Sequence, residues 1–186
     1  MSEPITYTID PAHSNAGFKV RHLMVSNVRG EFPGLKGTVV YDASNPANSR
    51  VEATIDVNSL TTRDEQRDAH LKSPDFFDAA TFPTITFVSR KVTKAAPGEW
   101  KVTGDLTIHG VTKEITLEVE GPTPEVRDPW GNTKTGINAT TKINRKDFGL
   151  TWNVALETGG VLVGEDIHIS IEAELARENA SVSTGA

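Results

Sequence analysis

Five histidines are the side chains of this sequence best suited to acid–base chemistry or metal binding, because imidazole changes its protonation state near neutral pH and is a common metal ligand. His168 falls on the polar face of a predicted strand and His109 in a predicted turn, so solvent exposure accounts for both. His70 lies on a predicted helix, where a local structural hydrogen bond is a simpler interpretation than catalysis. His13 and His22 remain as candidates for a functional role.

His22 is predicted to point into the protein, because it shares strand parity with Phe18 and Val20. A buried imidazole needs a hydrogen-bond partner. The residue is therefore either a satisfied core histidine or a donor that fixes the polar end of a ligand. A metal site is not favoured, since His13 and His22 are nine residues apart and no third ligand lies at a suitable spacing.

The sequence lacks the motifs of common enzyme chemistry. It has no Gly-x-Ser-x-Gly nucleophile elbow, no His-Glu-x-x-His zinc motif, no dinucleotide-binding glycine fingerprint and no cysteine. The charged segment 62–70 could suggest acid–base work, but a salt-bridged surface helix explains it equally well. We therefore expect no catalytic residue, no metal and no cofactor.

The charge balance and the amino terminus bear on partners and location. The 19 Lys and Arg residues against 25 Asp and Glu give a formal net charge of -6, so the surface as a whole is expected to repel nucleic acid and anionic membranes. Residues 1–4 lack the features of a secretory signal, and no window approaches the roughly 18 apolar residues of a transmembrane segment. We expect a cytoplasmic protein, or a periplasmic or secreted one if the sequence is that of a mature chain.

The elements that must position these side chains are predicted to be strands, because apolar and polar residues alternate with a period of two. Such strands have one dry and one wet face, which is typical of antiparallel sheets. The segments with this pattern or with strand-like composition are 6–10, 15–22, 28–32, 37–42, 51–57, 84–91, 100–108, 114–120, 136–143 and 167–175.

We expect about eight or nine strands to form from these ten candidate segments. A sheet of that many strands, with almost no helix to cover its apolar face, must form a sandwich or close on itself. Closure also removes exposed edges. One short surface helix is predicted near 62–72, with Thr62 and Glu65 as a capping box and Pro74 ending the segment. We expect a single domain over residues 1–176 and a flexible carboxyl-terminal tail over 177–186.

A set of short motifs, in a specific order and spacing, resembles the YceI-like family of lipid-binding, lipocalin-like proteins from about Tyr7 to about Glu174. The resemblance implies an extended eight-stranded antiparallel β-barrel whose lumen holds a polyisoprenoid or a similar long-chain amphiphile, with no established enzymatic activity. Relatives are often dimeric, so the resemblance also implies a homodimer. Tyr7 departs from the family, in which Trp is frequent at this position. The motifs are Tyr7–Ser14 with Phe18 and His22, Val28–Phe32 with Gly37, Ser59–Thr62, Arg67–Leu71, Ser73–Asp78, Phe82–Phe87 with Ser89, Gly104–Lys113 and Asn144–Gly149.

An eight-stranded barrel can be filled by its own side chains or can hold one small ligand, and the sequence leaves both open. With the lipid that the resemblance implies, we expect a carrier, store or sensor of a polyisoprenoid. A ligand-free scaffold and a lipid-modifying enzyme remain as alternatives. The polar end of the ligand is expected at His22 with His13 or Arg67. The apolar tail is expected to contact inward-facing or end-capping residues, namely Phe18, Val20, Phe76, Phe77, Phe87, Trp100, Val102, Leu106, Ile108, Ile137, Ile143, Phe148 and Trp152.

Overall fold

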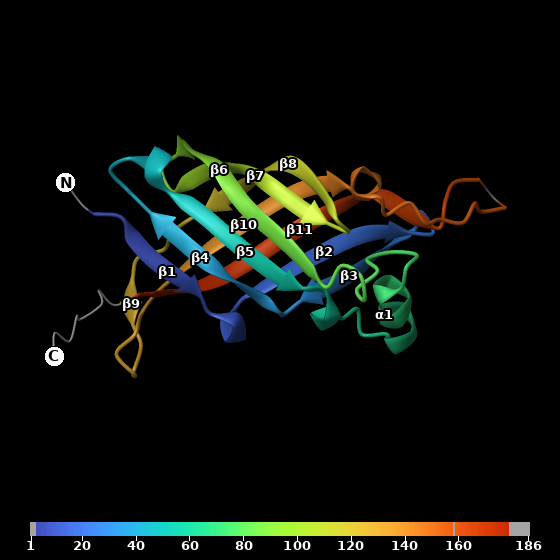
Figure 1. Cartoon of the computed structure of the whole chain (residues 1–186), viewed down its shortest axis with the longest axis horizontal. Helices are drawn as coiled ribbons and strands as arrows, with labels where there is room; N and C mark the ends of the chain where they lie inside the picture. The colour runs from blue at the N-terminus through green and yellow to red at the C-terminus, as the bar shows by residue number, and fades with distance from the viewer. Residues whose placement is uncertain (1–2, 158, 179–186) are drawn as a thin grey trace.

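The structure, a computed structural model, describes residues 3–157 and 159–178. Within these residues it contains strands, one α-helix and four short 3-10 helices (Figure 1). The strands are β1 Ile5–Ile9, β2 Asn15–His22, β3 Ser26–Phe32, β4 Leu35–Tyr41, β5 Arg50–Asp56, β6 Thr84–Ala96, β7 Glu99–Ile108, β8 Val111–Glu120, β9 Val126–Arg127, β10 Thr133–Asn144 and β11 Val163–Arg177. The helices are α1 Glu65–Lys72, η1 Pro11–His13, η2 Pro46–Asn48, η3 Val57–Ser59 and η4 Arg145–Phe148.

The strands β1, β4, β5, β6, β7, β8, β10 and β11 form a closed barrel in which each pairs with its neighbours in antiparallel orientation. Closure depends on β11, which pairs with β10 on one side and with β1 on the other. The predicted eight-stranded antiparallel barrel is confirmed. Two of the predicted strands, β2 and β3, lie outside this closed ring.

The strand β11 is 15 residues long and pairs with two different strands along one edge. Its carboxyl-terminal part pairs with β1, where Ile9 lies opposite Leu175, and its earlier part pairs with β2, where Phe18 lies opposite Ile169. The η1 turn connects β1 to β2. The hairpin of β2 and β3 therefore extends the barrel wall toward the end where α1 lies (Figure 1).

Alternation along the strands places the core inside the barrel, as predicted. On β7, Trp100, Val102, Leu106 and Ile108 are buried, whereas the residues between them are half-buried or exposed, apart from the buried Gly104. The sequence predicted β2 with its observed bounds and β6 five residues too short at its carboxyl-terminal end. The two-residue β9 was not predicted, since it is too short to show a period.

The short surface helix is also confirmed, but its cap is Asp64 and not Thr62. Asp64 Oδ1 accepts a hydrogen bond from the Arg67 amide at 3.0 Å. Arg63 has a φ of 64°, a left-handed conformation that cannot continue into a right-handed helix, so the helix starts after it. Thr62 instead donates its hydroxyl to Asp68 Oδ1 at 2.5 Å. Within residues 3–157 and 159–178, no helix has the length and apolar composition needed to cross a bilayer.

The carboxyl-terminal strand extends past the predicted domain boundary at residue 176. Arg177 is the last residue of β11, and the amide of Glu178 donates to the Thr6 carbonyl at 2.9 Å. The remainder of the predicted tail, residues 179–186, lies outside the described residues.

Candidate ligand-binding cavity

A cavity of about 230 Å³ lies inside the barrel, and its wall consists almost entirely of apolar atoms. At one end its lining includes Tyr7, whose hydroxyl bonds to Glu125 beside β9, and at the other end it includes Leu71 of α1 with Phe76 and Phe77. The volume is just below the range of roughly 300–1,000 Å³ that is common for ligand pockets. A cavity wall of this composition favours a hydrocarbon chain over a polar ligand.

Most of the residues expected to contact a lipid tail line this cavity. They are Phe18, Val20, Phe76, Phe77, Phe87, Trp100, Val102, Leu106, Ile108, Ile137 and Ile143. Phe148 and Trp152 do not line it. Phe148 is 1% exposed and packs in the surrounding core, because it belongs to the η4 turn and not to an inward-facing strand. Trp152 packs against Phe76 from outside the cavity, with ring centroids 5.2 Å apart.

The cavity wall includes many aliphatic residues that the predicted lumen omitted. The alternation of apolar and polar residues on β4, β5, β8 and β11 would have identified them as lumen-facing, because the inward face of every barrel strand contributes to the same lumen. They include Leu35, Val39, Val51, Ile55, Ile115, Leu117, Val119, Ile167, Ile169, Ile171 and Leu175, together with the smaller Ala53, Ala139 and Ala173.

Arg145 is the unexpected member of the cavity wall, because it is a cation that is only 3% exposed. Its guanidinium donates to four backbone carbonyls: Nε to Gly164 at 2.7 Å, Nη1 to Leu150 at 2.7 Å and to Trp152 at 2.9 Å, and Nη2 to Val163 at 3.2 Å. Burial lowers the pKa of Arg145 from its ordinary value, and the nearby charge of Glu165 opposes this effect. The side chain thus fixes the 150–152 segment to the start of β11.

The residues expected at the polar end of a ligand do not line the cavity. His22 is half-buried at the end of β2, and His13 is exposed on η1, outside the barrel. Arg67 donates from Nε to Thr62 Oγ1 at 2.8 Å and from Nη2 to the Thr62 carbonyl at 2.7 Å. The structure therefore does not bring these three side chains together at one site. Strand parity alone could not reveal this, because parity gives the face of a residue but not its place along the barrel, which depends on how β2 pairs with β11.

Aromatic side chains cover the end of the barrel near α1. Phe77 packs edge-on against Phe32 at a centroid distance of 5.6 Å, and Phe32 packs against Phe18 at the same distance. Outside this layer, the His70 ring lies 4.8 Å from that of Trp152. His70 Nε2 is 2.9 Å from Asp75 Oδ2, so a local hydrogen bond holds this histidine, as predicted. Phe18, Phe32 and Phe77 therefore form part of the cavity wall at this end.

The opposite end is narrowed by large side chains whose polar atoms are hydrogen-bonded. Trp100 Nε1 donates to the Gly121 carbonyl at 2.8 Å, and the Tyr7 hydroxyl donates to Glu125 Oε1 at 2.6 Å. Arg177 Nη1 lies 3.2 Å from the same carboxylate. Burial and the bond to Glu125 raise the pKa of Tyr7 well above its ordinary value. Tyr7 therefore presents its ring to the cavity while its hydroxyl is directed to Glu125.

The comparison with known families agrees with this architecture. The family model described as the YceI-like domain matches residues 7–175. The chain belongs to the YceI-like family.

Individual YceI-like relatives match along most of their length. UPF0312 protein SAS2572 of Staphylococcus aureus (strain MSSA476) is 41% identical over 170 residues, which cover 91% of this chain and 96% of that protein. The crystal structure of the Campylobacter jejuni YCEI protein is 33% identical with a TM-score of 0.69, covering 86% of this chain and 90% of that one. A polyisoprenoid binding domain from Saccharophagus degradans has the same fold, with 15% identity, a TM-score of 0.67 and coverage of 94% and 99%.

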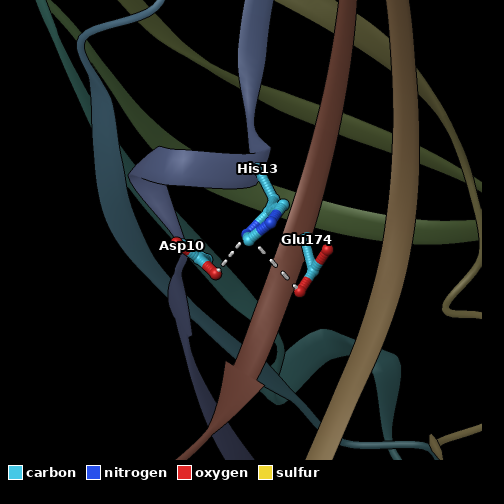
Figure 2. A group of neighbouring side chains, drawn as sticks. All are labelled: Asp10, His13 and Glu174. Carbon is cyan, nitrogen blue, oxygen red and sulfur yellow. Dashed lines mark hydrogen bonds and ion pairs between the residues drawn. The ribbon is translucent and has the colours of Figure 1, made fainter. Parts of the chain in front are cut away.

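A second group of side chains in this YceI-like protein lies outside the barrel (Figure 2). His13 Nδ1 is 2.9 Å from Asp10 Oδ2 and 3.9 Å from Glu174 Oε1. These three residues could form a metal triad, but Lys134 Nζ already lies 2.9 Å from Asp10 Oδ2 and 3.4 Å from Glu174 Oε1. Because the ammonium lies between both carboxylates, the arrangement favours an ionic cluster that joins η1, β10 and β11.

The ionic cluster shifts the protonation of its members. The hydrogen bond from His13, reinforced by Lys134, lowers the pKa of Asp10 to about 2. The same bond, with the charge of Glu174, raises the pKa of His13. The bond to Asp10 likewise raises the pKa of Lys134. At mildly acidic pH, Asp10 is therefore ionised while His13 and Lys134 are protonated.

Proposed function

We propose that this protein binds one long-chain amphiphilic lipid, a polyisoprenoid, in the barrel lumen, and that it carries, stores or senses this lipid without modifying it. The observation that carries the proposal is the apolar cavity that is lined from one end of the barrel to the other. Support also comes from the Saccharophagus degradans domain of the same fold, whose name states polyisoprenoid binding.

The dimensions of the barrel suit a long chain. The 12 residues of β10 extend over about 40 Å, and a strand tilt of about 40° reduces this to about 30 Å along the barrel axis. Each buried methylene contributes about 0.8 kcal/mol, so a tail of several isoprene units would be held firmly even after the cost of ordering it.

The same wall chemistry constrains the polar end of the ligand. The interior offers few polar atoms, and the most deeply buried cation, Arg145, already donates to four carbonyls. A head group buried there would lose its hydrogen bonds to water without replacement. We therefore place the head group at one end of the lumen, outside the apolar section.

Native mass spectrometry of freshly purified protein, followed by solvent extraction, tests this function. We expect a stoichiometric adduct that is released by organic solvent as a long-chain amphiphile of unchanged structure. A protein that carries no lipid and takes up none from added polyprenols would support the scaffold alternative instead. Conversion of the extracted lipid to a product on incubation with the protein would support an enzyme.

A further inference from the structure

The turn that joins β2 to β3 has an unusual combination of conformation and sequence. The Val25 amide donates to the His22 carbonyl at 3.1 Å, and the two central residues, Leu23 and Met24, have φ values of 52° and 62°. Two consecutive positive φ values define the hairpin turn that strongly prefers Asn-Gly, because larger side chains are sterically strained there. Here both positions carry large apolar residues, and their side chains face solvent.

The exposed apolar surface continues on the segment beside this turn. Leu23, Met24 and Val25 are 42%, 52% and 75% exposed, and Val154 is 47% exposed. The Leu23 amide donates to the Leu162 carbonyl at 2.8 Å, and the Leu162 amide donates to the Val154 carbonyl at 2.9 Å. The four residues Leu23, Met24, Val25 and Val154, named here the apolar tip, thus come from adjacent hydrogen-bonded segments at the α1 end of the barrel.

A row of basic side chains crosses the outer wall behind the apolar tip. Arg29 on β3 lies directly opposite Lys19 on β2, Lys19 lies opposite His168 on β11, and His168 lies opposite Lys142 on β10. Residues directly opposite one another share a face, and like charges in such positions are destabilising. We name these four residues the basic row.

The basic row is a local exception to the acidic character of the chain, whose formal net charge is -6. Among residues 3–157 and 159–178, no ion pair includes Lys19, Arg29 or Lys142. Three carboxylates flank the row on the same face. Glu31 lies on the side away from the tip and Asp166 on the side toward it, and Glu118 on β8 lies opposite Thr140, two residues from Lys142.

We propose that the apolar tip and the basic row dock this end of the barrel onto a lipid bilayer that contains anionic lipid. The tip would enter the interface, while Arg21 and the basic row face the head groups. Lys19 is four residues before Leu23, or about 13 Å along the strand. This separation suits an apolar group buried about 5–10 Å deep with cations at the membrane surface. The inference rests on the proposed function, because a carrier of a water-insoluble lipid must exchange it with a membrane.

A bilayer fits this surface better than a second copy of the chain does. A twofold dimer uses the same patch on both subunits. Burying the apolar tip in such a dimer would bring two basic rows toward each other, whereas an anionic bilayer neutralises them. Val154 of the apolar tip is two residues from Trp152, whose ring packs against Phe76 of the cavity wall, so docking would bring that end of the cavity to the membrane.

Flotation of the purified protein with phosphatidylcholine vesicles containing about one third phosphatidylglycerol tests the proposal. We expect binding to these vesicles, weaker binding to pure phosphatidylcholine, and loss at high salt. The double variant Leu23→Asn, Met24→Gly should bind at least tenfold more weakly. It supplies the residues that this turn prefers, so its thermal stability should equal or exceed that of the parent protein.

Two further variants separate the tip from the rest of the surface. The double variant Lys19→Ser, Arg29→Ser should weaken binding by about fivefold per removed cation. The matched control is Trp130→Ser, which removes an 83% exposed aromatic residue in the loop between β9 and β10 and should leave flotation unchanged. Flotation lost in Trp130→Ser and kept in the tip variant would overturn the proposal.

Retained lipid, measured on the same samples, distinguishes this proposal from the proposed function. Wild-type protein that holds a lipid but does not float would overturn docking while leaving lipid binding intact. Protein without lipid that still floats would overturn lipid binding while supporting docking. Absence of flotation, together with a dimer that the tip variant dissociates in analytical ultracentrifugation, would identify the tip as a contact between copies and overturn docking.

Discussion

The ring of Phe18 on β2 lies directly against the backbone of Gly30 on β3, the residue opposite it in the hairpin. A β-carbon at position 30 would come within 2.2 Å of Phe18 Cζ and within 2.9 Å of Thr62 Cγ2. Phe18 is also part of the cavity wall. The missing side chain at Gly30 therefore sets the position of a ring that borders the lumen near α1.

Replacement of Gly30 by Ala is expected to displace the Phe18 ring, because real β-carbons do not approach other atoms this closely. We expect a loss of about 1–3 kcal/mol in unfolding free energy, as is usual for overpacking, and weaker retention of the lumen lipid. Chemical denaturation and native mass spectrometry measure the two effects. Gly17→Ala is the matched control, since its β-carbon would meet its nearest neighbour at 3.4 Å. Equal effects of both variants would contradict this account.

Replacement of Arg145 by Lys is expected to destabilise the protein strongly. Lysine cannot reproduce four hydrogen bonds to carbonyls on two segments, and each carbonyl left without a partner costs about 1–3 kcal/mol. We expect a loss of at least about 3 kcal/mol in urea denaturation. Lys146→Met, which removes the exposed ion pair with Glu165, should cost less than about 1 kcal/mol. A loss of less than about 1 kcal/mol in Arg145→Lys as well would contradict the claim that the guanidinium holds the two segments together.

The ionic cluster predicts a specific pH dependence. The pKa of His13 is raised, so its contribution to stability is complete below the ordinary value of 6.5 and is lost as pH rises through the folded value. The pKa of Asp10 is lowered to about 2, so its contribution is complete above the ordinary value of 3.8 and is lost as pH falls toward 2.

Asp10→Asn should therefore move the pKa of His13 down toward 6.5, which an NMR titration of the imidazole C–H signals measures directly. The control Asp42→Asn alters a carboxylate that holds its own loop through Ser44 and Asn48, and it should leave His13 unchanged. An unaltered titration of His13 in Asp10→Asn would remove Asp10 as the cause of the shift.

The sequence predicted the barrel well because alternation is a local property. Val102 and Leu106 could be placed inside without knowing which strands are neighbours, since every inward face of a closed sheet meets the same lumen. The pairing of β11 with both β1 and β2 could not be predicted, because it depends on contacts between distant segments.

The polar residues were harder to place for the same reason. Arg145 follows a strand in sequence, and its partners at 163 and 164 become visible only when β11 returns beside it. The helix cap moved to Asp64 because Arg63 adopts a left-handed conformation, which no residue type other than Gly signals reliably. His22 was placed by parity alone, and parity gives the face of a residue but not its position along the barrel.

Filling the lumen of the barrel tests the central claim most directly. Ala139 is 5% exposed in the cavity wall, opposite Val119 and Ile171, whereas its neighbour Thr140 points outward on the same strand. Native mass spectrometry with solvent extraction should detect the long-chain lipid in wild type and in Thr140→Trp. It should detect little or none in Ala139→Trp, whose folding is checked by a cooperative thermal unfolding transition. Ala139→Leu should retain an intermediate amount. Undiminished lipid in folded Ala139→Trp would contradict the claim that the lipid lies in the lumen.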